Sequence, residues 1–518
     1  MKRRTRTFPY RERSILVIDL DKERFRFVKL GEAQAKKMLG GRLMALTLWN
    51  SYCNYQKLKP SDYESGNPIV IAIGAASDLD HPLLDGYVLA TRSPVTGSLS
   101  VTAGEGRIAK ALVGVGICAM VIQGRRSRIT HLAITDHDVT FSTREDLHNL
   151  TVGACHALSP ETPMIVIGPA AEAQVPQSSV DFDGRNLGRG GVGMVFALKN
   201  IKAITFPVGA VHVERTSYDP ASLGRLSAWV EKLQSWQRKG SRLSWGNRNG
   251  WLAINGFHDR VDGRMWALEG QKPLLPLLAL GPNLGVFDPA HIRPTLAACD
   301  DLGLDPFSAG VLLLWASRNG SVDPVRVLES VAYGKGPWMN LPKEMPGSFY
   351  RIGGLEMAPF DLRALPSQAV LAALGDDTIV YPALLHQKGF HSGREMFHAR
   401  VSVFCQDLRY AMESLGIAYR RSYVAFNQYF PFWMIHPFAL LARLASDSEG
   451  YPFSAVRIRN VGISCYRVQR EINRQLGWHE PERVPDPLMT DGSSNHRYPS
   501  VVTLPRLIEA YRLIRSRI

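Results

Sequence analysis

Short apolar runs dominate the first 210 residues and predict a strand-rich region. Such runs, bounded by Gly, Pro or Asp, are typical of buried β-strands. The predicted strands cover residues 14–19, 24–30, 69–73, 86–91, 117–123, 129–135 and 164–167. Residues 33–49 have helical spacing instead, and Gly40-Gly41 within them predicts an interruption of that helix.

From about residue 211 onward, apolar residues recur at the spacing of amphipathic helices. The predicted helices cover residues 221–238, 290–301, 309–317, 401–414, 437–445, 461–476 and 504–518. This change of pattern indicates an α+β fold class, because strands and helices are segregated along the chain. We expect a β-rich N-terminal domain at 1–210 and two helical domains at 211–400 and 401–518.

The composition excludes pervasive disorder, since 45% of the 518 residues are hydrophobic and 21% are charged. The net charge of +14 favours acidic partners or anionic ligands. Nucleic acid is not an expected partner, because the only dense basic run is at residues 1–13 and no recognised nucleic-acid module is present.

No apolar run approaches the roughly 20 residues needed to span a bilayer. The apolar run at 14–18 is too short for a secretion signal, so we expect a cytoplasmic protein. The six cysteines, at 53, 118, 155, 299, 405 and 465, form no CxxC or CxxxC pair. They therefore predict no local metal site, and Cys118 and Cys405 are interpreted as buried core thiols.

Three glycine-rich segments carry the candidate chemistry: residues 91–99, 165–172 and 184–193. In the third, Arg185 and Arg189 lie among glycines whose amides could form an anion nest. A phosphate-bearing cofactor site and a charged turn needed only for packing both remain open. The segment is not a Walker A motif, because no Gly-Lys-Ser/Thr closes it. It is not interpreted as a dinucleotide-binding fingerprint either, because we expect no helix-opening GxGxxG after a strand there.

These three segments, in this order, resemble the aldehyde ferredoxin oxidoreductase family of tungsten–pterin enzymes. Further similar segments lie at 39–42, 279–285, 299–305, 406–418 and 506–517, so the resemblance spans most of the chain. It implies a β-rich N-terminal domain of the pterin-binding type, followed by mostly helical C-terminal domains.

In that family, two pterins hold one metal ion, and DxxGL-like segments bond the pterin amines. The resemblance therefore implies a bis-pterin tungsten or molybdenum cofactor here. The implied cofactor-binding residues are Arg185, Asn186, Gly188, Arg189, Gly190, Gly191, Asp300, Leu304, Asp305, Glu413 and Ile417.

The sequence departs from the family at its redox centre. The family's [4Fe-4S] cluster takes three ligands from a CxxCxxxC loop and a fourth at the end of the second DxxGL-like segment. The corresponding region at 260–278 contains no cysteine, and Ala418 occupies the fourth position. We therefore expect no [4Fe-4S] cluster and no metal-ligating residues.

The catalytic residues of the family are also replaced. Its acid aligns with apolar residues at 272–278, and no histidine occurs at 377–383, where its cofactor-side histidine falls. His386, His391 and His398 lie downstream and either compensate or are ordinary hydrogen-bonded histidines. We assign no catalytic residue to this chain.

Three functions remain open. The first is a degenerate family member acting as a partner or regulatory subunit, or as a pterin-cofactor-binding scaffold. The second is a metal-pterin-dependent aldehyde oxidoreductase without its own cluster, which passes electrons to an acidic partner. The third is a basic anion- or nucleic-acid-binding protein. For the first two, we expect a homodimer or a heterodimer with an intact paralogue.

Overall fold

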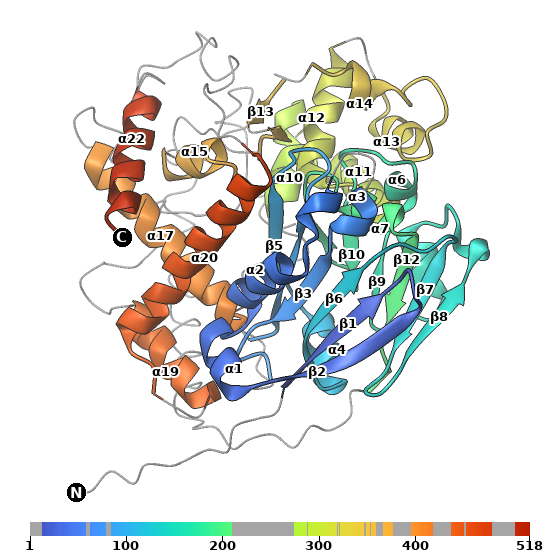
Figure 1. The fold of residues 1–518 in the computed structure, drawn as a ribbon. Helices are drawn as coiled ribbons and strands as arrows, with labels where there is room; N and C mark the ends of the chain where they lie inside the picture. Colours follow the sequence, from blue (N-terminus) through green and yellow to red (C-terminus); the bar gives the residue numbers. More distant parts are fainter. Residues whose placement is uncertain are drawn as a thin grey trace, which may run out of the picture.

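The computed structural model describes residues 13–58, 63–78, 84–209, 274–286, 288–318, 320, 322–346, 349–352, 354–358, 366–376, 395–417, 437–449, 452–478 and 503–518. Two six-stranded mixed sheets form the N-terminal part, and the described residues after them are mostly helical (Figure 1). The α+β class is therefore confirmed. The predicted helix at 221–238 lies outside the described residues, and the domain boundaries remain predictions.

The first sheet has the strand order β2-β1-β6-β3-β4-β5. Its strands are β1 (Arg13–Asp19), β2 (Arg24–Leu30), β3 (Ile69–Ile73), β4 (Gly86–Arg92), β5 (Leu99–Glu105) and β6 (Ile117–Gln123). Strands β1 and β6 are parallel, and the other neighbours are antiparallel. Every residue of β3 is buried, as expected for a strand covered on both faces.

The second sheet has the order β11-β10-β9-β12-β7-β8. Its strands are β7 (Thr130–Ile134), β8 (Val139–Thr143), β9 (Met164–Val166), β10 (Val180–Phe182), β11 (Asn186–Leu187) and β12 (Ile201–Thr205). The two sheets touch where the Tyr87 ring stacks on Phe182, with 5.2 Å between ring centroids. This contact joins β4 of the first sheet to β10 of the second.

Short helices accompany the sheets: α1 (Glu32–Met38), α2 (Gly41–Tyr52), α3 (Tyr63–Gly66), α4 (Arg107–Gly114), α5 (Val152–Leu158), α6 (Pro169–Glu172) and α7 (Val192–Leu198). The break predicted at Gly40-Gly41 is confirmed, because α1 ends before it and α2 begins at Gly41. A Cβ on Gly40 would lie 2.4 Å from the Ala75 amide nitrogen, so the backbones meet closely at this break.

The helical part contains α10 (Leu274–Leu280), α11 (Pro289–Leu302), α12 (Pro306–Ser317), α13 (Pro324–Ala332), α14 (Leu341–Glu344), α15 (Pro366–Ala373), α17 (Glu395–Leu415), α19 (Pro437–Glu449), α20 (Ala455–Gln475) and α22 (Thr503–Ser516). Strands β13 (Arg351–Ile352) and β14 (Leu355–Glu356) form a small hairpin there. Helices α11, α12 and α13 each start at an Asp-Pro pair, in which the aspartate caps the helix and proline takes its first position.

Helix α17 connects the two main hydrophobic cores. Its first half, including Val401 and Cys405, packs in a core with α11, α12, α13, α15 and α22. Its second half, including Met412 and Leu415, packs in a core with both sheets, α19 and α20. Figure 1 shows α17, α19, α20 and α22 gathered on one side of the sheets. Among the described residues, no helix is both long and apolar enough to cross a membrane.

Candidate functional site

Two chain segments of the DxxGL type dock on the N-terminal sheets in a similar way. At the first junction, the Ser179 amide donates to the Gly303 carbonyl at 2.9 Å. A Cβ on Gly168 would lie 2.3 Å from the Leu302 carbonyl oxygen, so backbone packs directly on backbone. We call the surroundings of residues 300–305 the first junction.

At the second junction, defined by residues 413–417, the Gly86 amide donates to the Gly416 carbonyl at 3.0 Å. A Cβ on Gly74 would lie 1.9 Å from the Gly416 nitrogen. Each junction thus requires glycine where a loop of a sheet meets a helical segment.

The third glycine-rich segment meets the first junction. The Asn186 side-chain amide donates to the Leu304 carbonyl at 2.6 Å, and Arg189 Nε lies 3.4 Å from Asp305 Oδ2. The first glycine-rich segment arrives at the same place, because Ser93 Oγ donates to the Gly190 carbonyl at 2.6 Å. Segments that are far apart in sequence therefore converge here.

The remaining implied cofactor-binding residues lie at or near the two junctions. Gly188, Gly190 and Gly191 have left-handed backbone conformations in the turn before α7. Arg185 is half-buried at the start of that turn. The other two are Asp300, half-buried in the last turn of α11, and Ile417, buried just after α17. Their cofactor-binding role remains a prediction.

One expectation about the third segment was wrong. Gly188, Gly190 and Gly193 do form a GxGxxG pattern between strand β11 and helix α7. The context is nevertheless unlike a dinucleotide-binding unit, since β11 has two residues and pairs antiparallel with β10. Helix α7, with seven residues, is also short.

Asp305 is the central carboxylate of the first junction. It caps α12 by accepting hydrogen bonds from the Ser308 amide at 2.9 Å and the Ser308 hydroxyl at 2.6 Å. Burial raises the pKa of Asp305, and the opposing influence of the Arg189 charge and of the Ser308 hydrogen bonds does not fully offset it. Arg189 also donates to the Glu356 carbonyl, which fixes the arginine above the carboxylate.

Four side-chain oxygens around the first junction are buried and have no hydrogen-bond partner among the described residues. They are Gln177 Oε1, Ser178 Oγ, Ser179 Oγ and Asn186 Oδ1. Leaving a buried polar atom unpaired costs about 1–3 kcal/mol, so four of them at one junction are informative. The first junction therefore has hydrogen-bonding capacity that suits a polar ring such as a pterin.

The second junction differs, because its carboxylate is paired with two buried arginines. Glu413 Oε2 accepts from Arg42 Nη1 at 2.7 Å, and Oε1 accepts from Arg409 Nε at 2.6 Å. Arg42 also donates to Gln469 at 2.7 Å and lies 3.8 Å above the Tyr410 ring centroid. Burial opposes the charge of Arg42, but Tyr410 and Glu413 outweigh it and raise the arginine pKa.

All six cysteines are described, and no three of their thiols come together in a group that could hold a metal. Cys118 and Cys465 are in the core shared by the sheets, whereas Cys299 and Cys405 are in the other large core. The interpretation of Cys118 and Cys405 as buried core thiols is confirmed. Burial raises the pKa of Cys405 and Cys465 to about 12, which keeps both thiols protonated. Such a donor set does not fit a [4Fe-4S] cluster, which needs four thiolates at one point.

No group of three or more His, Cys, Asp and Glu side chains could hold a metal ion within the described part of the chain. His398 is described and buried in α17. His386, His391, Ala418 and the residues at 377–383 lie outside the described residues. The sequence identified residues 39–42 as a segment that resembles the family, but it did not predict that Arg42 binds Glu413.

Both the sequence and the fold of this chain are similar to those of known proteins. Residues 15–207 match the aldehyde ferredoxin oxidoreductase N-terminal domain. The tungsten-containing aldehyde ferredoxin oxidoreductase of Pyrococcus furiosus is 26% identical over 343 residues, which are 55% of this chain and 54% of that protein. The Thermococcus kodakarensis enzyme of the same description is 26% identical over 347 residues, 57% and 56% of the two chains. The chain thus spans about half the length of these relatives.

A solved structure is similar in fold to nearly the whole of this chain. It is the active site complex BamBC of benzoyl-coenzyme A reductase, determined with 1,5-dienoyl-CoA. The similar chain superimposes with a TM-score of 0.78 at 14% identity, covering 98% of this chain and 95% of that one, and it shows a common fold. Residues 15–207 thus match the N-terminal domain of the aldehyde ferredoxin oxidoreductase family, and nearly the whole chain shares the fold of the similar chain in BamBC.

Proposed function

We propose that this chain is a diverged family member without a [4Fe-4S] cluster of its own, acting as a partner or regulatory subunit or as a pterin-binding scaffold. The placement of the six thiols carries the proposal, since no three of them form a group that could hold a metal, and a [4Fe-4S] cluster needs four thiolates. A chain that has lost this electron path is not a self-sufficient ferredoxin-dependent enzyme.

The first junction supports retention of a pterin. Ser178, Ser179 and Asn186 would hydrogen-bond the polar edge of the ring, because each has a buried atom without a partner among the described residues. When bound, a pterin of this family supplies dithiolene sulfurs to tungsten or molybdenum. Arg189, held by Asp305, would set the positive charge beside an anionic part of the ligand.

The contacts at the second junction support a site in which only the first junction binds a pterin. Arg42 and Arg409 each donate to one oxygen of Glu413, so two buried cations already balance the charge of this carboxylate. A second pterin amine at Glu413 would compete with these guanidinium groups, and displacing either one would leave a buried charge unpaired, which is costly. We therefore expect pterin binding, where it occurs, to depend on the first junction alone.

The experiment is pterin extraction from the full chain purified without oxygen, followed by fluorescence of the oxidised pterin. Wild type is expected to yield pterin, and Asn186→Ala is expected to lower the yield several-fold. Gln34→Ala is a matched control, because it removes an exposed side-chain amide from helix α1, where alanine fits the helical backbone. Equal yields from wild type and Asn186→Ala would contradict pterin binding at the first junction.

A second candidate function is a metal-pterin-dependent aldehyde oxidoreductase that passes electrons to an acidic partner. The polar atoms without partners at the first junction and the net charge of +14 favour it. Dye-linked aldehyde oxidation by the purified chain would support this function, and its absence in a pterin-containing preparation would support the scaffold.

The partner in this proposal is a second copy or an intact paralogue that carries CxxCxxxC, in the cytoplasm. A chain of the same fold occurs in the active site complex BamBC, which supports an assembly of this kind. Co-expression with an intact paralogue, followed by size-exclusion chromatography, tests it. Separate elution of the two chains would favour a homodimer or a monomer.

A further inference from the structure

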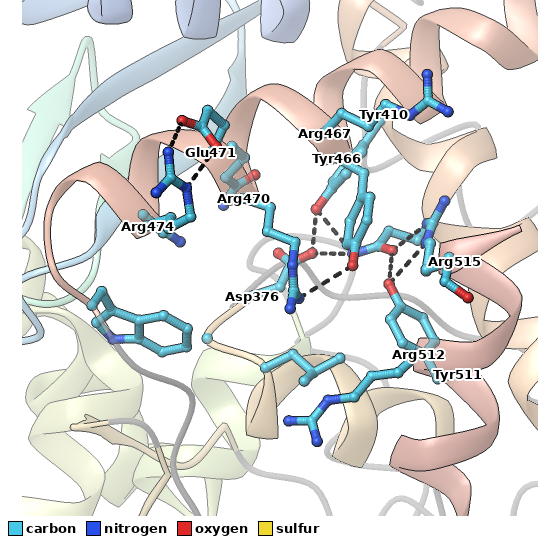
Figure 2. Close-up of a pocket in the computed structure, with 17 residues that line it drawn as sticks. Asp376, Tyr410, Tyr466, Arg467, Arg470, Glu471, Arg474, Tyr511, Arg512 and Arg515 are labelled. Carbon is cyan, nitrogen blue, oxygen red and sulfur yellow. Dashed lines mark hydrogen bonds and ion pairs between the residues drawn. The ribbon is translucent and has the colours of Figure 1, made fainter. Parts of the chain in front are cut away.

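A cavity of about 810 Å³ lies between the end of α15 and helices α17, α20 and α22 (Figure 2). Its volume is in the range of small-molecule sites, roughly 300–1,000 Å³. Tyr410 connects the cavity to the second junction, because its ring lines the cavity and also contacts Arg42. No role proposed above uses it.

Positive charge dominates the cavity wall. The described lining residues include five arginines and only two carboxylates. The arginines are Arg467, Arg470, Arg474, Arg512 and Arg515. Three of them, Arg467, Arg470 and Arg474, recur on α20 with spacings of three and four residues, which places like charges on one helix face, where they repel one another. A bound anion would remove this repulsion.

The two carboxylates in the wall are engaged by neighbouring side chains. Asp376 accepts hydrogen bonds from the Tyr410 hydroxyl and from Gln406, the latter at 2.6 Å. Glu471 pairs with Arg474 at 2.6 Å on the surface of α20. Figure 2 shows Arg470 reaching toward Tyr466 and Asp376, with Arg512 on the opposite wall. The arginines therefore outnumber the acids on both helices that face the cavity.

Aromatic rings complete the wall. Trp478 packs on the backbone of Gly375, where an added Cβ would lie 2.4 Å from the indole. Tyr466 and Tyr511 line the cavity as well, with their ring centroids 6.3 Å apart. Indole and phenol faces stack on flat ligand rings, and a guanidinium group can donate two parallel hydrogen bonds to a phosphate.

We propose that this cavity binds a small molecule that carries both a diphosphate and a flat ring, of the nucleoside diphosphate class. Arg470 and Arg512 contact the phosphates from opposite helices, and Trp478 contacts the ring. The inference is independent of the cluster-free function proposed above, since it uses none of the residues at the first junction.

The test is isothermal titration calorimetry of the full chain with ADP and, separately, with inorganic pyrophosphate at low ionic strength. We expect ADP to bind more tightly than pyrophosphate. The double variant Arg470→Ala/Arg512→Ala should weaken ADP binding at least tenfold. Trp478→Leu should weaken ADP binding and leave pyrophosphate binding nearly unchanged, because only ADP carries a ring.

The matched control is Arg128→Ala/Arg326→Ala, which removes the same charge from exposed positions elsewhere. It should bind ADP as wild type does, and thermal melting of every variant checks that it is folded. No ADP binding by wild type at millimolar concentration, or equal binding by the two double variants, would overturn the site. Pyrophosphate binding as tight as that of ADP would overturn the role of Trp478.

Discussion

Arg42 and Glu413 form a buried ion pair, with 2.7 Å between Nη1 and Oε2, although 371 residues separate them in sequence. Their side chains are 1% and 3% exposed. The pair joins α2, which packs on the first sheet, to the end of α17, which links the two cores. The ion pair therefore stabilises the second junction and links the helical part of the chain to the first sheet.

Glu413→Gln is expected to destabilise the protein strongly. The substitution leaves Arg42 and Arg409 buried without their shared carboxylate, and breaking a buried pair costs about 3–5 kcal/mol. The measurement is the free energy of unfolding in urea. Glu471→Gln is the matched control, because it removes a carboxylate from an exposed pair with Arg474 and should change the unfolding free energy little. Similar losses in both variants would contradict the role of the Arg42–Glu413 pair.

Gly74→Ala should disrupt the second junction by steric overlap. Its Cβ would lie 1.9 Å from the Gly416 nitrogen, so the loop after β3 must move away from the end of α17. Overpacking of this kind costs about 1–3 kcal/mol or more. Gly31→Ala is the control, because the nearest atom to its Cβ is a flexible side chain at 3.9 Å. Thermal melting compares the two, and an equally stable Gly74→Ala protein would show that the junction is looser than described.

Local patterns predicted most of the fold. Residues 24–30 and 117–123 were predicted as strands and form β2 and β6 with the same limits. Charged and apolar residues alternate through most of β2, and β6 is an apolar run. Strand β5 was missed, since Gly104 and polar residues interrupt its apolar pattern. Strands β10 and β11 have three and two residues, too few for a period to be recognised.

The candidate site was only partly predictable. The motifs located the segments that meet at the first junction, because each carries glycines needed for close backbone contact. The Arg42–Glu413 pair could not be found in this way, since nothing local to Arg42 indicates a partner 371 residues away. The GxGxxG pattern at residues 188–193 was misread, because a two-residue strand before it left no strand signal.

His156 should make stability depend on pH. Its Nε2 lies 2.8 Å from Asp181 Oδ1, and this hydrogen bond raises the pKa of His156 above 6.5 despite partial burial. A group whose pKa is raised on folding contributes stability that is complete below its unfolded pKa and is lost as pH rises through the folded value. The difference between the melting temperatures of wild type and His156→Gln should therefore be largest near pH 5.5, below the unfolded pKa, and should shrink as the pH rises from there to 9. A constant difference across this range would contradict the ion pair.

The cysteines should react slowly in the folded protein. Burial raises the pKa of Cys53, Cys405 and Cys465 to about 12, so thiolate is scarce at pH 8. Titration with a thiol-reactive disulfide reagent should proceed slowly under native conditions and reach all six cysteines after unfolding. Rapid reaction of several native thiols would show that they are exposed or activated, unlike core residues.

The most direct test of the central claim is the iron and acid-labile sulfide content of the full chain, purified without oxygen from cells supplied with iron and tungsten. If the chain has no cluster of its own, iron should be far below one atom per chain, with no broad visible absorbance, whether or not pterin is present. About four iron atoms and four sulfides per chain, with that absorbance, would contradict the account.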